Sequence, residues 1–141
     1  AVGLDRSKAM GELARQLLLR SKLAAPLVRG AALKLPFSAA TFQTVVTTFP
    51  SDTIMESAAL SEVRRVLKSD GVLVIVPMAS LTGNRFIDRG LELIYRLTGQ
   101  RGDGTQQIEA WVAAAGFQAT AEWVNLPGSR VMVVSARPVV G

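Results

Sequence analysis

The chain has 141 residues, about one domain, with a formal net charge of +5 and neither histidine nor cysteine. The absence of these two residue types excludes zinc hydrolases, Ser-His-Asp hydrolases and Cys-His enzymes, because their general base, thiolate nucleophile or metal ligands are missing. With 49% hydrophobic and 19% charged residues, the chain can build a core. An enzyme of this composition leaves the difficult chemistry to a cofactor or to the substrate.

The positive charge fits either nucleic-acid binding or the stabilisation of helix ends. Basic residues such as Arg20 and Arg65 fall in the last turns of predicted helices, where cations stabilise the helix dipole. The aromatic residues form no stacking run among basic side chains, so we expect no specific nucleic-acid binding. No apolar stretch approaches the ~20 residues that span a bilayer, and no export pattern is present, so we expect a cytoplasmic protein that is not transmembrane.

The first part of the chain alternates apolar strands with one helix. In chain order, the pattern predicts a strand, a helix, a weak short strand and a buried β-branched strand, at residues 1–4, 7–20, 26–28 and 44–48. Ser7 is the predicted N-cap of the helix. The apolar residues of that helix recur at helical spacing: Met10, Leu13 and Leu17.

The rest of the chain continues the alternation. In order, we expect a helix, a strand, a long helix, another helix and two strands, at residues 57–67, 72–76, 84–97, 106–115, 118–124 and 130–136. The first of these helices carries four inward-facing residues, namely Leu60, Val63, Val66 and Leu67. Asp70 and Gly71 are predicted to stop it, residues 77–83 to form an irregular loop, and Gly116 to end the last helix. A Pro-Gly turn at residues 125–129 makes the last two strands an antiparallel pair.

Strands that alternate with helices, without repeats or a linker, predict a single α/β domain over residues 1–141. We expect a mostly parallel sheet covered on both faces, with an antiparallel hairpin at its C-terminal end. No residue type in this pattern indicates a metal site.

Five short motifs, in order and at matching spacings, make the chain similar to a known family. They are Asp5-x-Ser7-x-x-Met10, Gly30-Ala31-Ala32-x-x-Leu35-Pro36-Phe37, Phe42-x-x-Val45, Glu62-x-x-Arg65-Val66-Leu67 with Asp70-Gly71, and Ala115-Gly116-Phe117. The chain resembles the class I S-adenosylmethionine (SAM)-dependent methyltransferases of the type 11 subgroup, which includes ubiquinone and menaquinone biosynthesis enzymes. The resemblance implies a Rossmann-like fold, SAM as the cofactor and a small, apolar or aromatic methyl acceptor.

The resemblance also implies a cofactor site. Asp5 takes the position of the acid that accepts hydrogen bonds from the SAM ribose, and a carboxylate offers two oxygens to a vicinal diol. Alternatively, Asp5 only caps the helix that follows it. The same resemblance assigns Arg6, Ala31, Ala32 and Thr47 to the cofactor site, and no catalytic residue is identified.

The chain departs from the family pattern at three points. Ala31 stands where the family has the aspartate that receives the adenine amino group, and Gln43 stands where it has the acid of its F-D-x-V motif. The first strand and its glycine-rich loop are missing, although in the family this strand lies between the strands expected at residues 2–4 and 44–48. We therefore expect one of three outcomes: these two strands pair directly, a second copy fills the gap in a homodimer, or the sequence is a fragment of a longer protein.

Three residues are expected to meet the acceptor. Phe49 follows the strand that ends at the methyl-transfer centre in the family, although Phe49-Pro50 also fits a simple turn. Tyr95 and Arg96 lie on the helix at 84–97, which is either a lid over an apolar acceptor or core. The rival functions are a non-catalytic methyltransferase-like domain that dimerises or scaffolds, and an NAD-type oxidoreductase half-domain, against which the Leu35-Pro36-Phe37 context argues.

Overall fold

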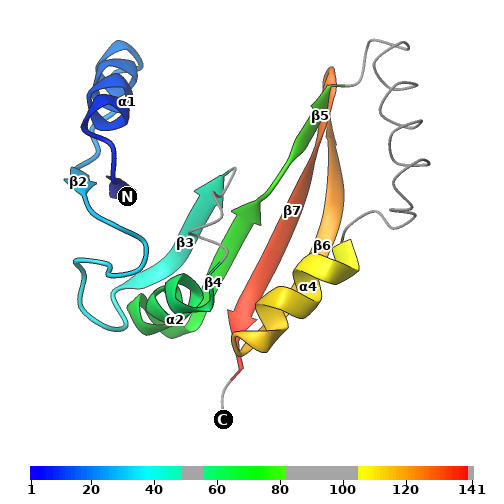
Figure 1. Ribbon diagram of the computed structural model, residues 1–141. Helices are drawn as coiled ribbons and strands as arrows, with labels where there is room; N and C mark the ends of the chain where they lie inside the picture. The colour runs from blue at the N-terminus through cyan, green and yellow to red at the C-terminus, as the bar shows by residue number, and fades with distance from the viewer. Residues whose placement is uncertain (49–55, 82–104, 140–141) are drawn as a thin grey trace.

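The protein contains two neighbouring sheets and their connecting helices (Figure 1). The computed structural model describes residues 1–48, 56–81 and 105–139. In chain order the elements are β1 (Gly3–Asp5), α1 (Lys8–Arg20), β2 (Leu27–Arg29), β3 (Phe42–Thr48), α2 (Ser57–Val66), β4 (Leu67–Val76), β5 (Ala79–Leu81), α4 (Thr105–Ala114), β6 (Phe117–Leu126) and β7 (Ser129–Pro138). None of the helices in these ranges is long and apolar enough to cross a membrane.

The strands pair as an α/β fold with an antiparallel C-terminal part. β1 pairs in parallel with β2 to form the smaller sheet. In the larger sheet β3 is parallel to β4, and β7 runs antiparallel to β4, β5 and β6. The predicted α/β class and the terminal hairpin are confirmed.

The two sheets are not joined through β1 and β3. Among the described strands, β1 pairs with β2 alone and β3 with β4 alone. Direct pairing of these two segments, the first of the three expected outcomes, is therefore wrong. The separation leaves one edge of each strand facing the other sheet.

Helix α1 begins where the sequence predicts, but its apolar stripe is uncovered. Ser7 is the N-cap, and its Oγ accepts a hydrogen bond from the backbone N–H of Met10 at 3.3 Å. Met10, Leu13 and Leu17 are 52%, 49% and 53% exposed. Helical periodicity therefore predicts the element, while nothing in the described part of the chain buries this face.

Helix α2 ends earlier than predicted. The helix stops at Val66, Leu67 takes extended backbone angles, and β4 starts at once. Asp70 and Gly71 belong to an irregularity inside β4 and are not a helix stop. Phe42 pairs with Leu67, and Thr44 already pairs with Val72.

Two residues explain this irregularity. A Cβ on Gly71 would lie 2.9 Å from the carbonyl oxygen of Lys68 and 3.2 Å from that of Gln43, so only glycine fits without a shift. The Gln43 side-chain Nε2 donates a hydrogen bond to the Asp70 carbonyl at 3.2 Å. An aspartate at position 43 lacks this donor, so glutamine has a structural role here.

The core lies between the larger sheet and helices α2 and α4, which Figure 1 shows on one side of it. Its buried cluster comprises Leu60, Val63, Leu67, Leu73, Ile75, Val112, Phe117, Val134 and Ala136. Leu60, Val63 and Val66 are buried as predicted for α2, and Leu67 is also buried but as the first residue of β4. The strand predicted as buried at residues 44–48 is not, because β3 is an edge strand whose residues are all half-buried or exposed.

Among the described residues after β4, the helix and the two last strands lie close to their predicted bounds, and one further strand was not predicted. Ala79–Leu81, expected to be irregular, forms β5 and pairs with Ser129–Val131 of β7. A three-residue strand is too short to show a period, so only the pairing reveals it. Gly116 (φ 80°) follows α4, and Gly128 (φ 75°) lies in the hairpin turn, two positions where glycine tolerates a positive φ.

Candidate cofactor site

The predicted cofactor residues gather where strands end. β1 ends at Asp5 and β2 at Arg29, and the Gly30 N–H donates a hydrogen bond to the Asp5 carbonyl at 3.1 Å. β3 ends one residue after Thr47. In open α/β sheets, ligands bind beyond the carboxyl ends of the strands, so this edge is the candidate cofactor site.

The Asp5 carboxylate is exposed and caps the turn that follows. Its Oδ1 accepts a hydrogen bond from the Ser7 N–H at 2.7 Å. Its second oxygen has no hydrogen bond to any residue that the structure describes. Asp5 therefore closes a turn just before α1, whose N-cap is Ser7, and its other oxygen is available to a ligand hydroxyl.

Arg6 lies at the same exposed edge and contributes a backbone contact. Its carbonyl accepts a hydrogen bond from the Nε of Arg29 at 3.1 Å, which joins the residue after β1 to the end of β2. Two guanidinium groups therefore belong to this edge beside the Asp5 carboxylate. Among the residues that the structure describes, neither guanidinium has a side-chain partner that would hold it away from a bound anion.

Ala31 and Ala32 begin the loop after β2. The Ala31 carbonyl accepts a hydrogen bond from the Lys34 N–H at 3.1 Å, which closes a tight turn. Ala31 has no side-chain acceptor for an adenine amino group. A bound adenine would therefore hydrogen-bond to backbone or water at this position.

An apolar cavity of about 200 Å³ separates this loop from β3. Ala32 and Thr47, two of the predicted cofactor residues, line it from opposite sides. Its other walls come from the start of the chain, the loop, β3, α2, β4 and α4: Val2, Leu4, Leu35, Phe37, Phe42, Thr44, Val45, Val46, Leu60, Val63, Val66, Leu73, Ile75 and Trp111. The structure therefore places an apolar hollow beside an exposed acid, a combination that suits the base and ribose of a nucleoside.

The loop that carries Ala31 and Ala32 is held by Glu62 and Arg65 of α2, which the sequence indicates only as parts of a family motif and, for Arg65, as a cation at a helix end. Arg65 and Glu62 form a two-pronged ion pair, with Nε to Oε1 at 2.7 Å and Nη2 to Oε2 at 2.8 Å. Glu62 Oε2 also accepts from the Leu35 N–H at 2.8 Å. Arg65 donates to the carbonyls of Phe37 at 2.8 Å and Leu35 at 3.0 Å.

This ion pair makes the carboxyl group of Glu62 more acidic. The Arg65 hydrogen bonds, with the Leu35 N–H next in importance, lower the pKa of Glu62 from 4.5 to about 2. The spacing of three residues in Glu62-x-x-Arg65 is the sequence signal that could have revealed the pair, since such residues are neighbours on a helix. The pair connects the E-x-x-R-V-L and L-P-F motifs in space.

The predicted acceptor residues Phe49, Tyr95 and Arg96, together with the helix expected at 84–97, lie outside the described residues. Within the described residues, no three acidic side chains gather closely enough to hold a metal ion.

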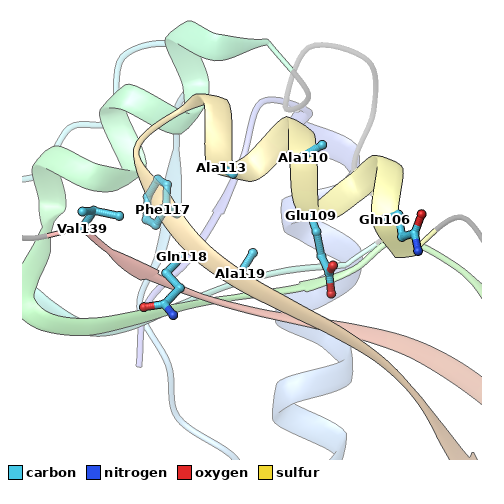
Figure 2. Close-up of a pocket in the computed structure, with 8 residues that line it drawn as sticks. All are labelled: Gln106, Glu109, Ala110, Ala113, Phe117, Gln118, Ala119 and Val139. Carbon is cyan, nitrogen blue, oxygen red and sulfur yellow. The ribbon is translucent and has the colours of Figure 1, made fainter.

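A second, more open pocket of about 600 Å³ lies between α4 and β6 (Figure 2). Its lining includes Glu109, whose Oε1 accepts a hydrogen bond from the Ala121 N–H at 2.6 Å. None of the predicted cofactor residues lines it. This pocket therefore has no part in the candidate site.

A family model described as a methyltransferase domain matches residues 1–75, more than half of the chain. The chain belongs to this methyltransferase family. The matched region contains every predicted cofactor residue as well as Glu62 and Arg65. The methyltransferase domain has no significant match among curated proteins.

Solved structures agree with the fold. A protein from Pyrococcus horikoshii OT3 is 20% identical, with a TM-score of 0.64 over 98% of this chain and 73% of its own. A SAM-dependent methyltransferase from Aquifex aeolicus is 15% identical, with a TM-score of 0.64 over 96% and 68%. The cyclase SpnF is 15% identical, with a TM-score of 0.66 over 99% and 66%. At such identities the likeness shows the Rossmann-like methyltransferase fold alone.

Proposed function

We propose that this methyltransferase domain binds SAM at the carboxyl ends of β1, β2 and β3 and transfers its methyl group to a small apolar or aromatic acceptor. The observation that carries the proposal is the position of Asp5: its unbonded carboxylate oxygen stands at a strand end beside an apolar cavity, in a chain of the methyltransferase family. The residues present fit the nucleoside part of SAM.

SAM supplies an activated methyl sulfonium, so transfer requires positioning and the exclusion of water more than acid–base groups. This suits a chain without histidine or cysteine. In the proposed site, Asp5 accepts a hydrogen bond from the ribose, and Ala32 and Thr47 border the adenine. The backbone near Ala31 and the residue Arg6 complete the cofactor contacts.

The acceptor is proposed on the resemblance to quinone-biosynthesis methyltransferases, with Phe49, Tyr95 and Arg96 as its contacts. A screen of quinols, phenols and lipids for methyl transfer from labelled SAM tests this part. Transfer only to a charged acceptor, such as a basic peptide, would contradict it. A cytoplasmic location stays a prediction, which fractionation of the native protein tests.

The second candidate function is a non-catalytic scaffold or dimerisation module. The open edges of β1 and β3 favour it, because unpaired strands are templates for association. A scaffold of this kind has no need of the second Asp5 oxygen, and the two functions therefore differ in what they require of position 5.

Calorimetric titration with SAM and S-adenosylhomocysteine separates the two functions. Asp5→Asn keeps an oxygen that can accept from the Ser7 N–H but loses the charge and one acceptor. We expect this variant to fold as stably as the wild type and to bind SAM on the order of tenfold more weakly, the effect of one hydrogen bond to a charged group. Glu12→Gln, on the exposed face of α1, is the matched control and should bind normally.

Absence of heat at millimolar SAM would remove the cofactor proposal and leave the scaffold. Equal affinity of the wild type and Asp5→Asn would remove Asp5 from the site. Saturable binding that weakens only in Asp5→Asn would exclude a purely structural role for this acid.

A further inference from the structure

The positive charge of the chain is concentrated in one segment, residues 6–29. This segment has a single acid, Glu12, and six cations: Arg6, Lys8, Arg15, Arg20, Lys22 and Arg29. Six cations against one acid give +5, which equals the net charge of the whole chain, so the acids and cations of all other residues balance. Charge of one sign gathered on one element attracts a partner of the opposite sign.

The cations towards the end of α1 are free to meet such a partner. Arg15, Arg20 and Lys22 are exposed, and their side chains make no hydrogen bond or ion pair with the part of the chain that the structure describes. Glu12 lies 3.9 Å from Lys8 on the exposed side of the helix, a pairing that contributes little in water. The helix dipole accounts for cations at the last turn, such as Arg20, but not for Arg15.

Two leucines are exposed among these cations. Leu19 is 67% exposed, more than any other large apolar residue in the described ranges, and Leu23 is 61% exposed. Arg15 and Leu19 are four residues apart and share one face of the helix, while Leu23 follows directly after its end. We call Arg15, Leu19, Arg20, Lys22 and Leu23 the helix-end patch.

The helix-end patch is separate from the apolar stripe of α1. At 3.6 residues per turn, Leu19 lies about 160° around the helix from Leu17 and about 120° from Leu13. The side chains of the stripe and of the patch therefore point to different sides. Leu13 is also about half exposed, so it offers a matched control for a leucine change on the same helix.

The backbone at the end of α1 makes the choice of lysine at position 22 informative. Lys22 has a φ of 55°, in the left-handed region. The Leu23 N–H donates to the Leu18 carbonyl at 2.9 Å and the Lys22 N–H to the Leu19 carbonyl at 3.1 Å, the two hydrogen bonds of a Schellman helix end. Glycine fits this position with less strain than any residue with a side chain. The stability of the turn thus gives no reason for a lysine, whereas binding to an anionic partner does.

We propose that the helix-end patch binds the surface of an anionic lipid bilayer. Leu19 and Leu23 enter the boundary between headgroups and acyl chains, and the three cations reach the lipid phosphates with their long side chains. Exposed leucines next to unpaired cations are the features that distinguish a lipid surface from other polyanions. A nucleic acid would satisfy the cations but would leave both leucines in water.

The helix-end patch and the candidate cofactor site can be occupied together. Asp5 lies at the start of α1, whereas Leu19 is near its end, about 18 Å further along the helix axis. Figure 1 shows α1 at the edge of the molecule, away from α2 and α4. A domain held by the patch therefore keeps Asp5 accessible, and the inference does not depend on the proposed function.

Sedimentation with lipid vesicles measures the binding. We expect saturable binding to phosphatidylcholine vesicles that contain about a third phosphatidylglycerol, and binding at least tenfold weaker to phosphatidylcholine alone. Raising the salt concentration from about 0.05 M to about 0.5 M should weaken the binding, because salt screens the lipid charge. Equal affinity for the two kinds of vesicle, or no binding to either, would overturn the proposal.

Charge variants locate the binding surface. Arg15→Gln and Lys22→Gln should each weaken binding about fivefold, the effect of one cation near an anionic surface. Lys68→Gln, which removes an exposed cation from β4, should leave it within twofold. Glu12→Gln removes the only acid of residues 6–29 and should bind more tightly than the wild type. The same loss in Lys68→Gln as in Arg15→Gln would show that only the net charge matters, which would refute the patch.

Leucine variants distinguish a lipid surface from other anionic partners. Leu19→Ala and Leu23→Ala should each weaken binding at least fivefold through lost apolar burial, and alanine keeps a high helix propensity. Leu13→Ala, the control on another side of the helix, should bind within twofold of the wild type. Unchanged binding in the first two variants, with equally tight binding to duplex DNA, would identify a general polyanion site and contradict the proposal.

Lys22→Gly separates binding from folding. Glycine relieves the positive φ, so this variant should unfold at a higher temperature and yet bind vesicles about fivefold more weakly. Unchanged vesicle binding in Lys22→Gly would remove Lys22 from the patch. SAM titration is the independent readout: vesicle binding without SAM binding keeps this inference and removes the proposed function, and the reverse result removes this inference alone.

Discussion

Residues 1–48 and the later described residues are packed differently. Every fully buried apolar side chain of the described structure lies between Ala59 and Ala136. In residues 1–48 no side chain is fully buried, and the helix of this region, α1, has no buried residue. The first region nevertheless contains all the predicted cofactor residues.

Most of the stability and most of the candidate site therefore come from different parts of the molecule. The later region has a sheet with two helices on one side of it, as Figure 1 shows, and a cluster of buried apolar side chains lies between them. Apart from β3, which pairs with β4 in the larger sheet, the first region has a two-stranded sheet with one helix, and such a small unit is marginal by itself. Its order therefore depends on contacts such as the Glu62–Arg65 pair, which attaches the loop after β2 to α2.

The largest expected contrast comes from truncating one apolar side chain in each region. Phe117 is 1% exposed and lies in the core, so Phe117→Ala should lower the free energy of unfolding by about 3–5 kcal/mol. Leu17 is 53% exposed, so Leu17→Ala should change it by less than about 0.5 kcal/mol. Urea denaturation measures both. A large loss of stability in Leu17→Ala would show that this face of α1 is packed and that the two regions do not differ in burial.

Replacing either of two glycines by alanine should change the stability in opposite directions. A Cβ on Gly116 would meet the guanidinium of Arg64 at a positive φ of 80°, so Gly116→Ala should lower the stability by about 1–2 kcal/mol. Gly11 lies inside α1, and a Cβ added there would have nothing within 4 Å, so Gly11→Ala should favour the helix by about 0.5–1 kcal/mol.

Thermal unfolding followed by far-ultraviolet circular dichroism measures this pair. If the two regions unfold together, Gly11→Ala raises the single midpoint. If β1, α1 and β2 unfold separately from the larger sheet, only an early phase of the transition moves. A lower midpoint in Gly11→Ala would contradict the expected effect.

The contact between the regions should depend on pH. Because the pKa of Glu62 falls from 4.5 to about 2 on folding, the ionised carboxylate stabilises the folded state above pH 4.5. This stabilisation is lost as the pH drops from 4.5 towards 2. Urea midpoints measured at pH 6 and pH 3 should therefore differ more in the wild type than in Glu62→Gln. An identical pH dependence in both proteins would show that the pair does not contribute.

The smallest expected effect concerns the edge of the larger sheet. Gln43→Glu removes the donor that bonds the Asp70 carbonyl and should lower the stability by about 0.5–1 kcal/mol. Gln118→Glu, on the exposed side of β6, is the control, since its side chain makes no hydrogen bond with the described part of the chain. An equal loss of stability in both variants would show that the added charge, and not the lost hydrogen bond, causes the effect.

The sequence predicted most elements whose side chains carry a clear period or a local signal. The helix at Lys8–Arg20 is expected from its spacing and from Ser7, and the hairpin of β6 and β7 from its Pro-Gly turn. The predicted end of α2 is wrong, because Asp70-Gly71 is a common helix stop and the bulge that requires Gly71 exists only through pairing with β3. β5 escapes prediction for the same reason, since only its pairing with β7 defines it.

In the candidate site, too, some features could be predicted from the sequence and others depend on the folded structure. Asp5 could be identified from the sequence because it follows a predicted strand, precedes a predicted helix and is the first residue of the Asp5-x-Ser7-x-x-Met10 motif. Its hydrogen bond to the Ser7 N–H, and the oxygen that remains available, depend on atomic positions. The Glu62–Arg65 contacts with Leu35 and Phe37 join residues about a fifth of the chain apart, which no local pattern predicts.

The α/β class, the order of most elements and the methyltransferase family follow from the amino-acid sequence, because periodicity, turn residues and short motifs are local properties. The separation of β1 from β3 and the apolar cavity between the loop after β2 and β3 are visible in the folded chain alone. Strand neighbours and exposed faces arise from contacts between residues distant in the chain. Their free energy depends on which surfaces meet, and no window of sequence contains that information.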